Sequence, residues 1–125
     1  MSKPADWLAH AESDLTIARL GSASEKVLPS QVCFHAQQAA EKAIKAVMLH
    51  HQVDFPLIHD IEELLEIAED HHLAIPSEIF RAVSLTPFAV ETRYPGFHQE
   101  ISREEADQAI VLASVVLAWA KETIK

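Results

Sequence analysis

Arg93 and His98 are the two residues of this sequence whose types and spacing best suit chemistry. Four residues separate them, and Pro95 and Gly96 lie between. Proline fixes its own φ at about −65° and glycine accepts positive φ, so the pair favours a turn over a helix. A turn would let the two polar side chains converge instead of spreading along a helix.

An arginine and a histidine held together suit metal-free chemistry on a phosphodiester. The Arg93 guanidinium is a permanent planar cation that matches phosphate oxygens, and His98 can exchange a proton near neutral pH. The pair could take the proton of an attacking hydroxyl and stabilise the charge that develops on phosphorus oxygens. Tyr94 and Phe97 are candidates for packing the turn or stacking a base. The alternative is a surface turn with two solvated polar residues, because this spacing arises easily by chance.

Composition predicts one small helical domain. The chain has 125 residues, 49% of them apolar, and only 2 glycines. This length corresponds to a single domain, residues 1–125, with a sizeable core. Few glycines with many Ala, Leu, Glu and Lys residues favour helices over strands. The net charge of −9 argues against coating duplex DNA through a broad basic face, but it leaves room for one cationic pocket.

The sequence predicts a cytoplasmic protein. Its first residues are polar, unlike a signal peptide, and no run of about 18 apolar residues is present to span a membrane. Cys33 is the single cysteine, so a disulfide framework cannot form and a reducing compartment is favoured.

Apolar residues recur at helical spacing along five segments. Long helices with short connections favour an all-α, up-and-down bundle without a sheet. Residues 21–24 are expected to break the pattern after the first helix, and Pro87 to kink or end the fourth. The expected helices cover residues 4–19, 29–51, 59–71, a stretch from about residue 76, and 102–123.

The last expected helix carries two signals of its own. Ser102 and Glu105 have the spacing of a capping box, in which each side chain accepts a hydrogen bond from the other's backbone N–H. Apolar residues occupy much of its circumference, which requires burial on more than one side. A second copy of the chain would provide that burial, so we expect a homodimer; otherwise this helix is the central one of the bundle. The apolar residues are Ile110, Val111, Leu112, Val115, Val116, Leu117 and Trp119.

Two acidic residues are explained more simply by stability than by chemistry. Asp14 lies at the edge of an apolar stripe and needs a partner, which Lys42, Lys45 or His59 could supply. Asp60 is expected to cap the third helix, because a carboxylate is favourable at the positive end of a helix dipole.

A polar set on the second helix is expected to be a solvated face. Its members lie within about two turns, and Glu41 and Lys45 have the favoured orientation of an i,i+4 pair. Lys42 and Lys45 are also candidate cations for binding RNA or a nucleotide. The set comprises Gln38, Glu41, Lys42 and Lys45.

Histidine and cysteine spacing gives no metal signal. His50–His51 and His71–His72 are adjacent pairs, whose side chains point about 100° apart on a helix and cannot easily share one ion. Neither a His-x3-His nor a Cys-x2-Cys spacing occurs. We therefore expect no metal and no other cofactor. Cys33 has apolar neighbours in a helical stretch and is expected to be an inert core residue.

Three stretches together resemble the HEPN domain family. They are residues 33–46 (CFHAQQAAEKAIKA), 59–65 (HDIEELL) and 93–96 (RYPG). The start of the chain, from Trp7 to Leu15, is similar to the same family, so the resemblance covers essentially the whole sequence. It implies four main helices plus a short extra one, usually paired as a homodimer.

The resemblance also implies an activity. Many members of this family are metal-independent endoribonucleases with an R-x4-6-H motif, which Arg93 and His98 match, and two subunits bring their copies into one cleft. Such proteins often act as toxins beside a small nucleotidyltransferase antitoxin, whereas others bind nucleotides. One version of the motif continues to a tyrosine two residues after the histidine, which the partner modifies with AMP. Glu100 stands there in this chain, so that modification is not expected, and a negative charge lies near the expected site.

Three functions are therefore in competition. The first is RNA cleavage, in which His98 takes the proton of a ribose 2′-hydroxyl and Arg93 stabilises charge at phosphorus, leaving a 2′,3′-cyclic phosphate. The second is a binding module that docks a nucleotidyltransferase or holds a nucleotide, which the −9 charge and Glu100 favour. The third is a structural helical dimer in which Arg93 and His98 tie a loop to the core.

Overall fold

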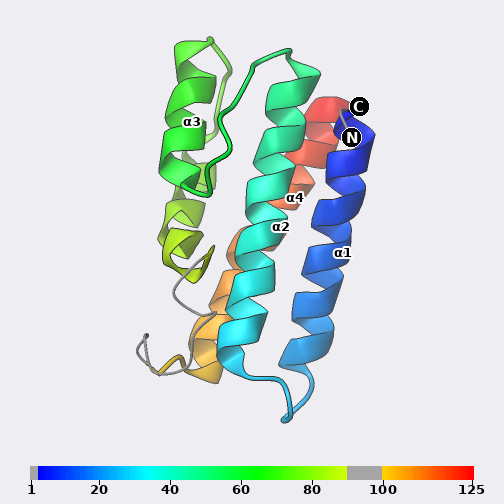
Figure 1. Cartoon of the computed structure of the whole chain (residues 1–125), viewed down its shortest axis with the longest axis vertical. Helices are drawn as coiled ribbons and strands as arrows, with labels where there is room; N and C mark the ends of the chain where they lie inside the picture. Colours follow the sequence, from blue (N-terminus) through cyan, green and yellow to red (C-terminus); the bar gives the residue numbers. More distant parts are fainter. Residues whose placement is uncertain (1–2, 90–99) are drawn as a thin grey trace.

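A computed structural model describes residues 3–89 and 100–125, and within those ranges the chain is helical, with no strand (Figure 1). The expected all-α class is confirmed: the described ranges hold four α-helices and one 13-residue helix of 3-10 type. None of the helices in these ranges is long and apolar enough to cross a membrane. The elements are α1 (Pro4–Ser22), α2 (Pro29–His50), α3 (Ile61–Asp70), η1 (Ser77–Ala89) and α4 (Arg103–Ile124).

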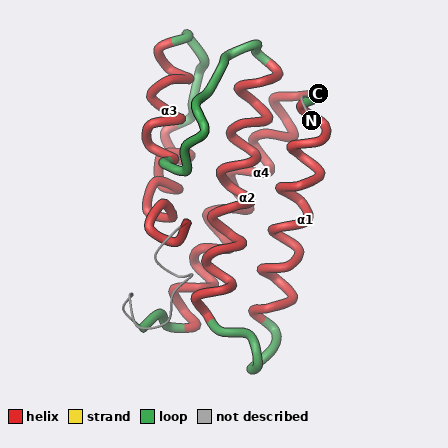
Figure 2. Tube along the Cα trace, viewed as in Figure 1, coloured by secondary structure: helices red, strands yellow, loops and turns green. Residues whose placement is uncertain are grey.

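The helix α2 occupies the centre of the bundle and packs against α1, α3, η1 and α4. In Figure 1, α1 and α3 flank it on opposite sides and α4 runs behind it. The tube view shows α1 and α2 joined by a short loop at one end of the bundle, with the start of α4 at that same end (Figure 2). The alternative in which the last helix is central is therefore wrong, because α2 holds that position.

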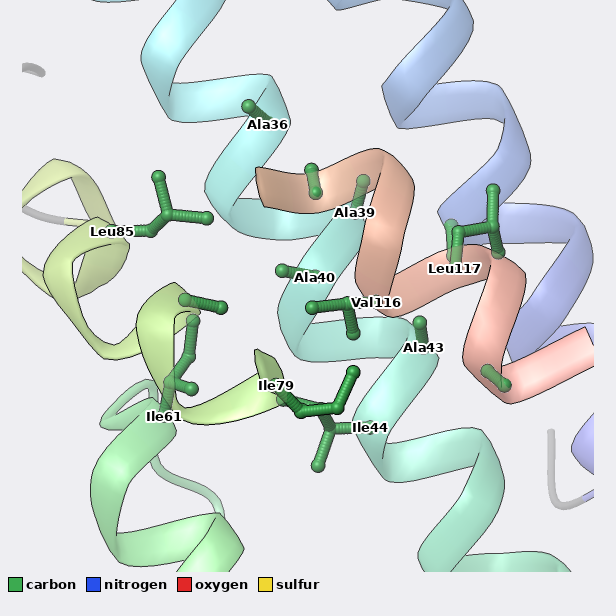
Figure 3. Packing of buried hydrophobic residues seen from close by; sticks show 14 of the residues in the cluster. Ala36, Ala39, Ala40, Ala43, Ile44, Ile61, Ile79, Leu85, Val116 and Leu117 are labelled. Atoms are coloured by element: carbon green, nitrogen blue, oxygen red, sulfur yellow. The ribbon is translucent and has the colours of Figure 1, made fainter. Parts of the chain in front are cut away.

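Small residues on α2 explain why so many helices can approach it. Ala36, Ala39, Ala40 and Ala43 are fully buried, and larger side chains of the neighbouring helices fill the space beside them. Figure 3 shows Ile61, Ile79, Leu85, Val116 and Leu117 around this row of alanines. The core therefore alternates small residues of the central helix with bulky residues from α3, η1 and α4.

The break expected at residues 21–24 begins later than predicted, since α1 continues through Gly21 to Ser22. Gly21 is buried, and a Cβ at that position would lie 2.9 Å from a methyl carbon of Val27 and 3.2 Å from one of Val32. The glycine therefore serves close packing against the following loop and helix more than it ends α1.

Side-chain hydrogen bonds from Asp60 and from Thr86 of η1 hold the first turn of α3. Asp60 caps α3 as expected, accepting from the backbone N–H of Glu63 at 3.2 Å. The backbone N–H of Ile61 donates to Thr86 Oγ1 on η1 at 3.1 Å. Pro87 lies inside η1, which continues to Ala89, so the proline does not end the helix.

Candidate functional site

The motif residues Arg93 and His98, together with Tyr94, lie outside the described residues. The chain on either side of them is firmly held. Ala89, the last residue of η1, is buried, and α4 begins at Arg103. The candidate catalytic segment therefore connects two well-packed helices.

The start of α4 is fixed by the predicted capping box. Ser102 Oγ accepts from the Glu105 backbone N–H at 3.1 Å, and the Ser102 N–H donates to Glu105 Oε1 at 3.1 Å. The Arg103 guanidinium then donates to the backbone carbonyls of Ser24, Glu25 and Val27. These contacts fasten α4 to the α1–α2 loop, although the two segments are distant in sequence.

A cavity of about 360 Å³ lies beside Glu100, at the end of the bundle where α2 and α4 begin. Glu100 therefore faces a space that a ligand could enter, close in sequence to the motif. The cavity is lined by Leu28, Pro29, Ser30, Glu100, Ile101 and Arg103.

A second hollow runs between η1 and α4. It includes a cavity of about 340 Å³ whose apolar wall comes from Val111, Leu112 and Val115 of α4. Glu78 and Arg81 of η1 line the same cavity. A smaller cavity of about 180 Å³ shares Leu112 and extends toward Phe88. The apolar face of α4 is thus only partly covered by the bundle, and Val111 remains 61% exposed.

The Asp14 carboxylate has two side-chain partners on α2, one of which was expected from the sequence. One carboxylate oxygen accepts from Lys42 Nζ at 2.7 Å, and the other lies 3.0 Å from His35 Nδ1. Of the three partners considered from the sequence, Lys42 is the correct one, and His35 was not anticipated. This Asp14 cluster joins α1 to two turns of α2.

Lys45 and His59 pair instead with Glu41. The Glu41 carboxylate lies 2.9 Å from Lys45 Nζ and 2.9 Å from His59 Nδ1, and it accepts from Gln37 Nε2 at 2.9 Å. Lys45 also donates to the carbonyl of Ile58 at 3.0 Å. This Glu41 cluster fastens the chain before α3 to the central helix.

The prediction of a solvated face on α2 is wrong for these two residues. Glu41 is 3% exposed and Lys45 is 4% exposed. Two aromatic rings cover the ammonium, since Lys45 Nζ lies 5.8 Å from the Trp7 ring centroid and 5.5 Å from that of Phe55. The cation is stabilised by a carboxylate, a carbonyl and two ring faces. Glu41 and Lys45 do form the predicted i,i+4 ion pair, but the pair is buried.

Cys33 is confirmed as a core residue. It is fully buried, and burial raises the pKa of its thiol to about 12, with a smaller contribution from the negative charge of Glu105. A thiol of this kind is a poor nucleophile at neutral pH. In the described parts of the chain, no group of three or more His, Cys, Asp or Glu residues is arranged to hold a metal ion.

Comparison with known proteins gives a consistent result. The model of the HEPN domain family matches residues 4–123. The archaeal HEPN homologue ST0689 has a crystal structure that is 29% identical, with full coverage of both chains and a TM-score of 0.80. The crystal structure of TT1696 from Thermus thermophilus is 31% identical over 98% of this chain and 99% of its own, with a TM-score of 0.79. No curated protein matches the chain.

Proposed function

The chain belongs to the HEPN domain family, and from this premise we propose that it is a metal-independent endoribonuclease acting through Arg93 and His98. The observation that carries the proposal is the match of these two residues to the family's R-x4-6-H motif, inside the 4–123 region that the family model covers. The described residues on either side of the motif belong to the packed bundle, since Ala89 is buried and Ser102 caps α4.

The proposed reaction uses a nucleophile that belongs to the substrate. His98 takes the proton of a ribose 2′-hydroxyl, and the 2′-oxygen attacks the adjacent phosphorus. Arg93 stabilises the negative charge that develops on the phosphorus oxygens. The bond from phosphorus to the 5′-oxygen breaks, and that oxygen takes a proton to become a 5′-hydroxyl. The other product end is a 2′,3′-cyclic phosphate.

We further propose that the active unit is a homodimer. HEPN domains commonly form dimers, and two copies would supply one neutral histidine as a base and one protonated histidine as an acid. Histidine is suited to both roles because it titrates near neutral pH. Tyr94 is proposed to stack on a base of the RNA beside this pair.

The hollow between η1 and α4 is the surface that we assign to the second copy. Its apolar wall of Val111, Leu112 and Val115 is what a dimer interface buries. Glu78 and Arg81 on η1 make no ion pair with any described residue. In a two-fold arrangement Glu78 would face Arg81 of the partner subunit, and the reverse pair would form as well.

Lys42 and Lys45 are the cations expected to bind RNA or a nucleotide. We propose that they instead support the function indirectly, by stabilising the fold. Lys45 is enclosed by its own partners, and Lys42 is held by Asp14. The external partner that the family implies is a nucleotidyltransferase antitoxin. Since Glu100 stands where a modifiable tyrosine would be, that partner would act by binding and not by adenylylation at this position.

The alternative function is a binding module that holds a nucleotide or docks a partner without cleavage. The observation that favours it is the net charge of −9, which weakens the attraction for an RNA backbone. The two functions predict different products from the same mixture, so one experiment separates them.

The test is incubation of the purified full chain with a structured RNA in excess EDTA, followed by analysis of the new ends. The proposal expects 2′,3′-cyclic phosphate and 5′-hydroxyl ends at a rate that EDTA leaves unchanged. Intact RNA at high protein concentration would assign the binding function. Cleavage that stops in EDTA would exclude the metal-independent mechanism.

A further inference from the structure

The cavity beside Glu100 combines polar, charged and apolar side chains from the start of α2 and the start of α4. Its volume of about 360 Å³ falls within the range of about 300–1,000 Å³ that is typical of small-molecule sites. It brings together the first turn of α2, the residues just before α4 and the first residue of α4. None of its lining residues takes part in the proposed cleavage step.

The first turn of α2 is open toward an anion. Leu28, which precedes the helix, provides no side-chain cap, Pro29 has no N–H, and the first turn holds no acidic residue. The backbone N–H of Ser30 has no acceptor among the described residues. A 22-residue helix carries a partial positive charge at this end, where exposed N–H groups attract phosphate.

The Ser30 side chain independently points to a missing partner. Ser30 is 7% exposed and lines the cavity, yet its hydroxyl has no hydrogen-bond partner in the described ranges. Buried hydroxyl groups are nearly always hydrogen-bonded. A ligand oxygen in the cavity would satisfy this hydroxyl together with the Ser30 N–H.

Two charged side chains at the cavity can still make hydrogen bonds to a ligand. Arg103 makes three hydrogen bonds to carbonyls of the α1–α2 loop, and its guanidinium has five N–H donors. Neither Arg103 nor Glu100 forms an ion pair within the described part of the chain. The cavity therefore offers cationic donors and a carboxylate acceptor side by side.

We propose that this cavity binds one nucleotide of the RNA strand, a guanosine, with its phosphate at Ser30 and its base on Glu100. The proposal rests on the proposed function for its substrate, RNA, and assigns a specificity subsite to it. A free phosphate would be repelled by Glu100, whereas a nucleotide has acceptors on its phosphate and donors on its base. Leu28, Pro29 and Ile101 supply the apolar surface against which a base can pack.

Glu100 accounts for the choice of base. Guanine presents its N1–H and its amino group side by side on one edge, which fits the two oxygens of a carboxylate. Uracil presents carbonyl oxygens on both sides of a single N–H, and these oxygens would face the carboxylate. A good two-point contact discriminates between bases by roughly tenfold or more. The cavity is thus expected to bind guanosine and to reject uridine.

The test is an NMR titration of the full chain with GMP, UMP and inorganic phosphate, following the backbone amides of Ser30 and Gln31. GMP is expected to shift both amides and to bind roughly tenfold more tightly than UMP. Ser30→Asp should abolish these shifts, because its carboxylate occupies the anion position while remaining favourable to the helix. The matched control is Ala5→Asp, which places the same group at the second residue of α1, outside the cavity. Glu100→Gln should bring the GMP and UMP affinities together.

Each outcome bears on the subsite separately from cleavage. Unshifted Ser30 and Gln31 amides at saturating GMP, or equal losses in Ser30→Asp and Ala5→Asp, would overturn the proposal even in a protein that cleaves RNA. An unchanged preference for GMP in Glu100→Gln would overturn the assignment of the base to Glu100. If the protein binds GMP but leaves RNA intact, the result would support the guanosine subsite and contradict the proposed ribonuclease function.

Discussion

Replacement of Lys45 by methionine should strongly destabilise the protein, because it leaves the Glu41 carboxylate buried without its cation. Methionine keeps most of the side-chain volume and remains compatible with the Trp7 and Phe55 rings. Glu41 would retain only Gln37 and His59 as hydrogen-bond partners. Breaking a buried ion pair by removing one partner costs about 3–5 kcal/mol.

A loss of this size is easily measured by thermal unfolding. It corresponds to a fall in Tm of roughly 10–20 °C for a chain of this length. Lys121→Met is the matched control, since the Lys121–Glu12 pair has a similar separation of 2.8 Å but both side chains are about half exposed. That variant should lose less than about 1 kcal/mol. The double variant Glu41→Leu/Lys45→Met should lose less than Lys45→Met alone, because no charge is left buried.

The assay is circular dichroism at 222 nm during heating, at equal protein concentration for all variants. A Lys45→Met protein that melts within about 2 °C of the wild type would refute the account of the Glu41 cluster. So would equal losses in Lys45→Met and Lys121→Met, since burial would then make no difference.

Three further predictions concern the interface, the thiol and the helix cap. Val111→Asp should convert the proposed dimer to a 13.9 kDa monomer in sedimentation. Leu57→Asp, at a 97% exposed position that does not line the hollow between η1 and α4, should leave the dimer intact. A monomeric wild type would contradict the proposed interface. Cys33 should resist alkylation at pH 8 until the protein unfolds, and rapid alkylation of the native protein would contradict this. The pKa of the thiol is near its ordinary value of 9.0 in the unfolded chain and about 12 in the folded protein, so folding stability should decline as pH rises above 9. Ser102→Ala should cost about 0.5–2 kcal/mol of stability in urea denaturation, and an unchanged midpoint would show that the cap contributes nothing.

Local signals in the sequence were sufficient to predict the number and approximate positions of the described helices and the N-caps of α3 and α4. Ser102 with Glu105, and Asp60, are recognisable from spacing alone because the hydrogen bonds that they make span three residues. The end of α1 was predicted too early because Gly21 is there for packing against Val27 and Val32, which a local pattern does not reveal.

The buried polar cluster could not be predicted in the same way. Glu41 and Lys45 look like a surface pair, and what buries them comes from Trp7, Phe55 and the chain around His59. The alanines spread around α2 were the available signal, since a helix that neighbours can approach on every side has no solvated face. Arg93 and His98 were found from residue type and spacing, and their role stays a prediction.

The most direct test of the proposed ribonuclease activity is the metal-independent cleavage rate of His98→Ala compared with the wild type. With RNA in excess EDTA, loss of a general base should lower the rate by about 10²–10⁴-fold, while helicity and sedimentation stay unchanged. Arg93→Lys should also be strongly impaired, because an ammonium keeps the charge but loses the planar fork. Equal rates in the wild type and both variants would contradict the account and assign the cleavage to a contaminating enzyme.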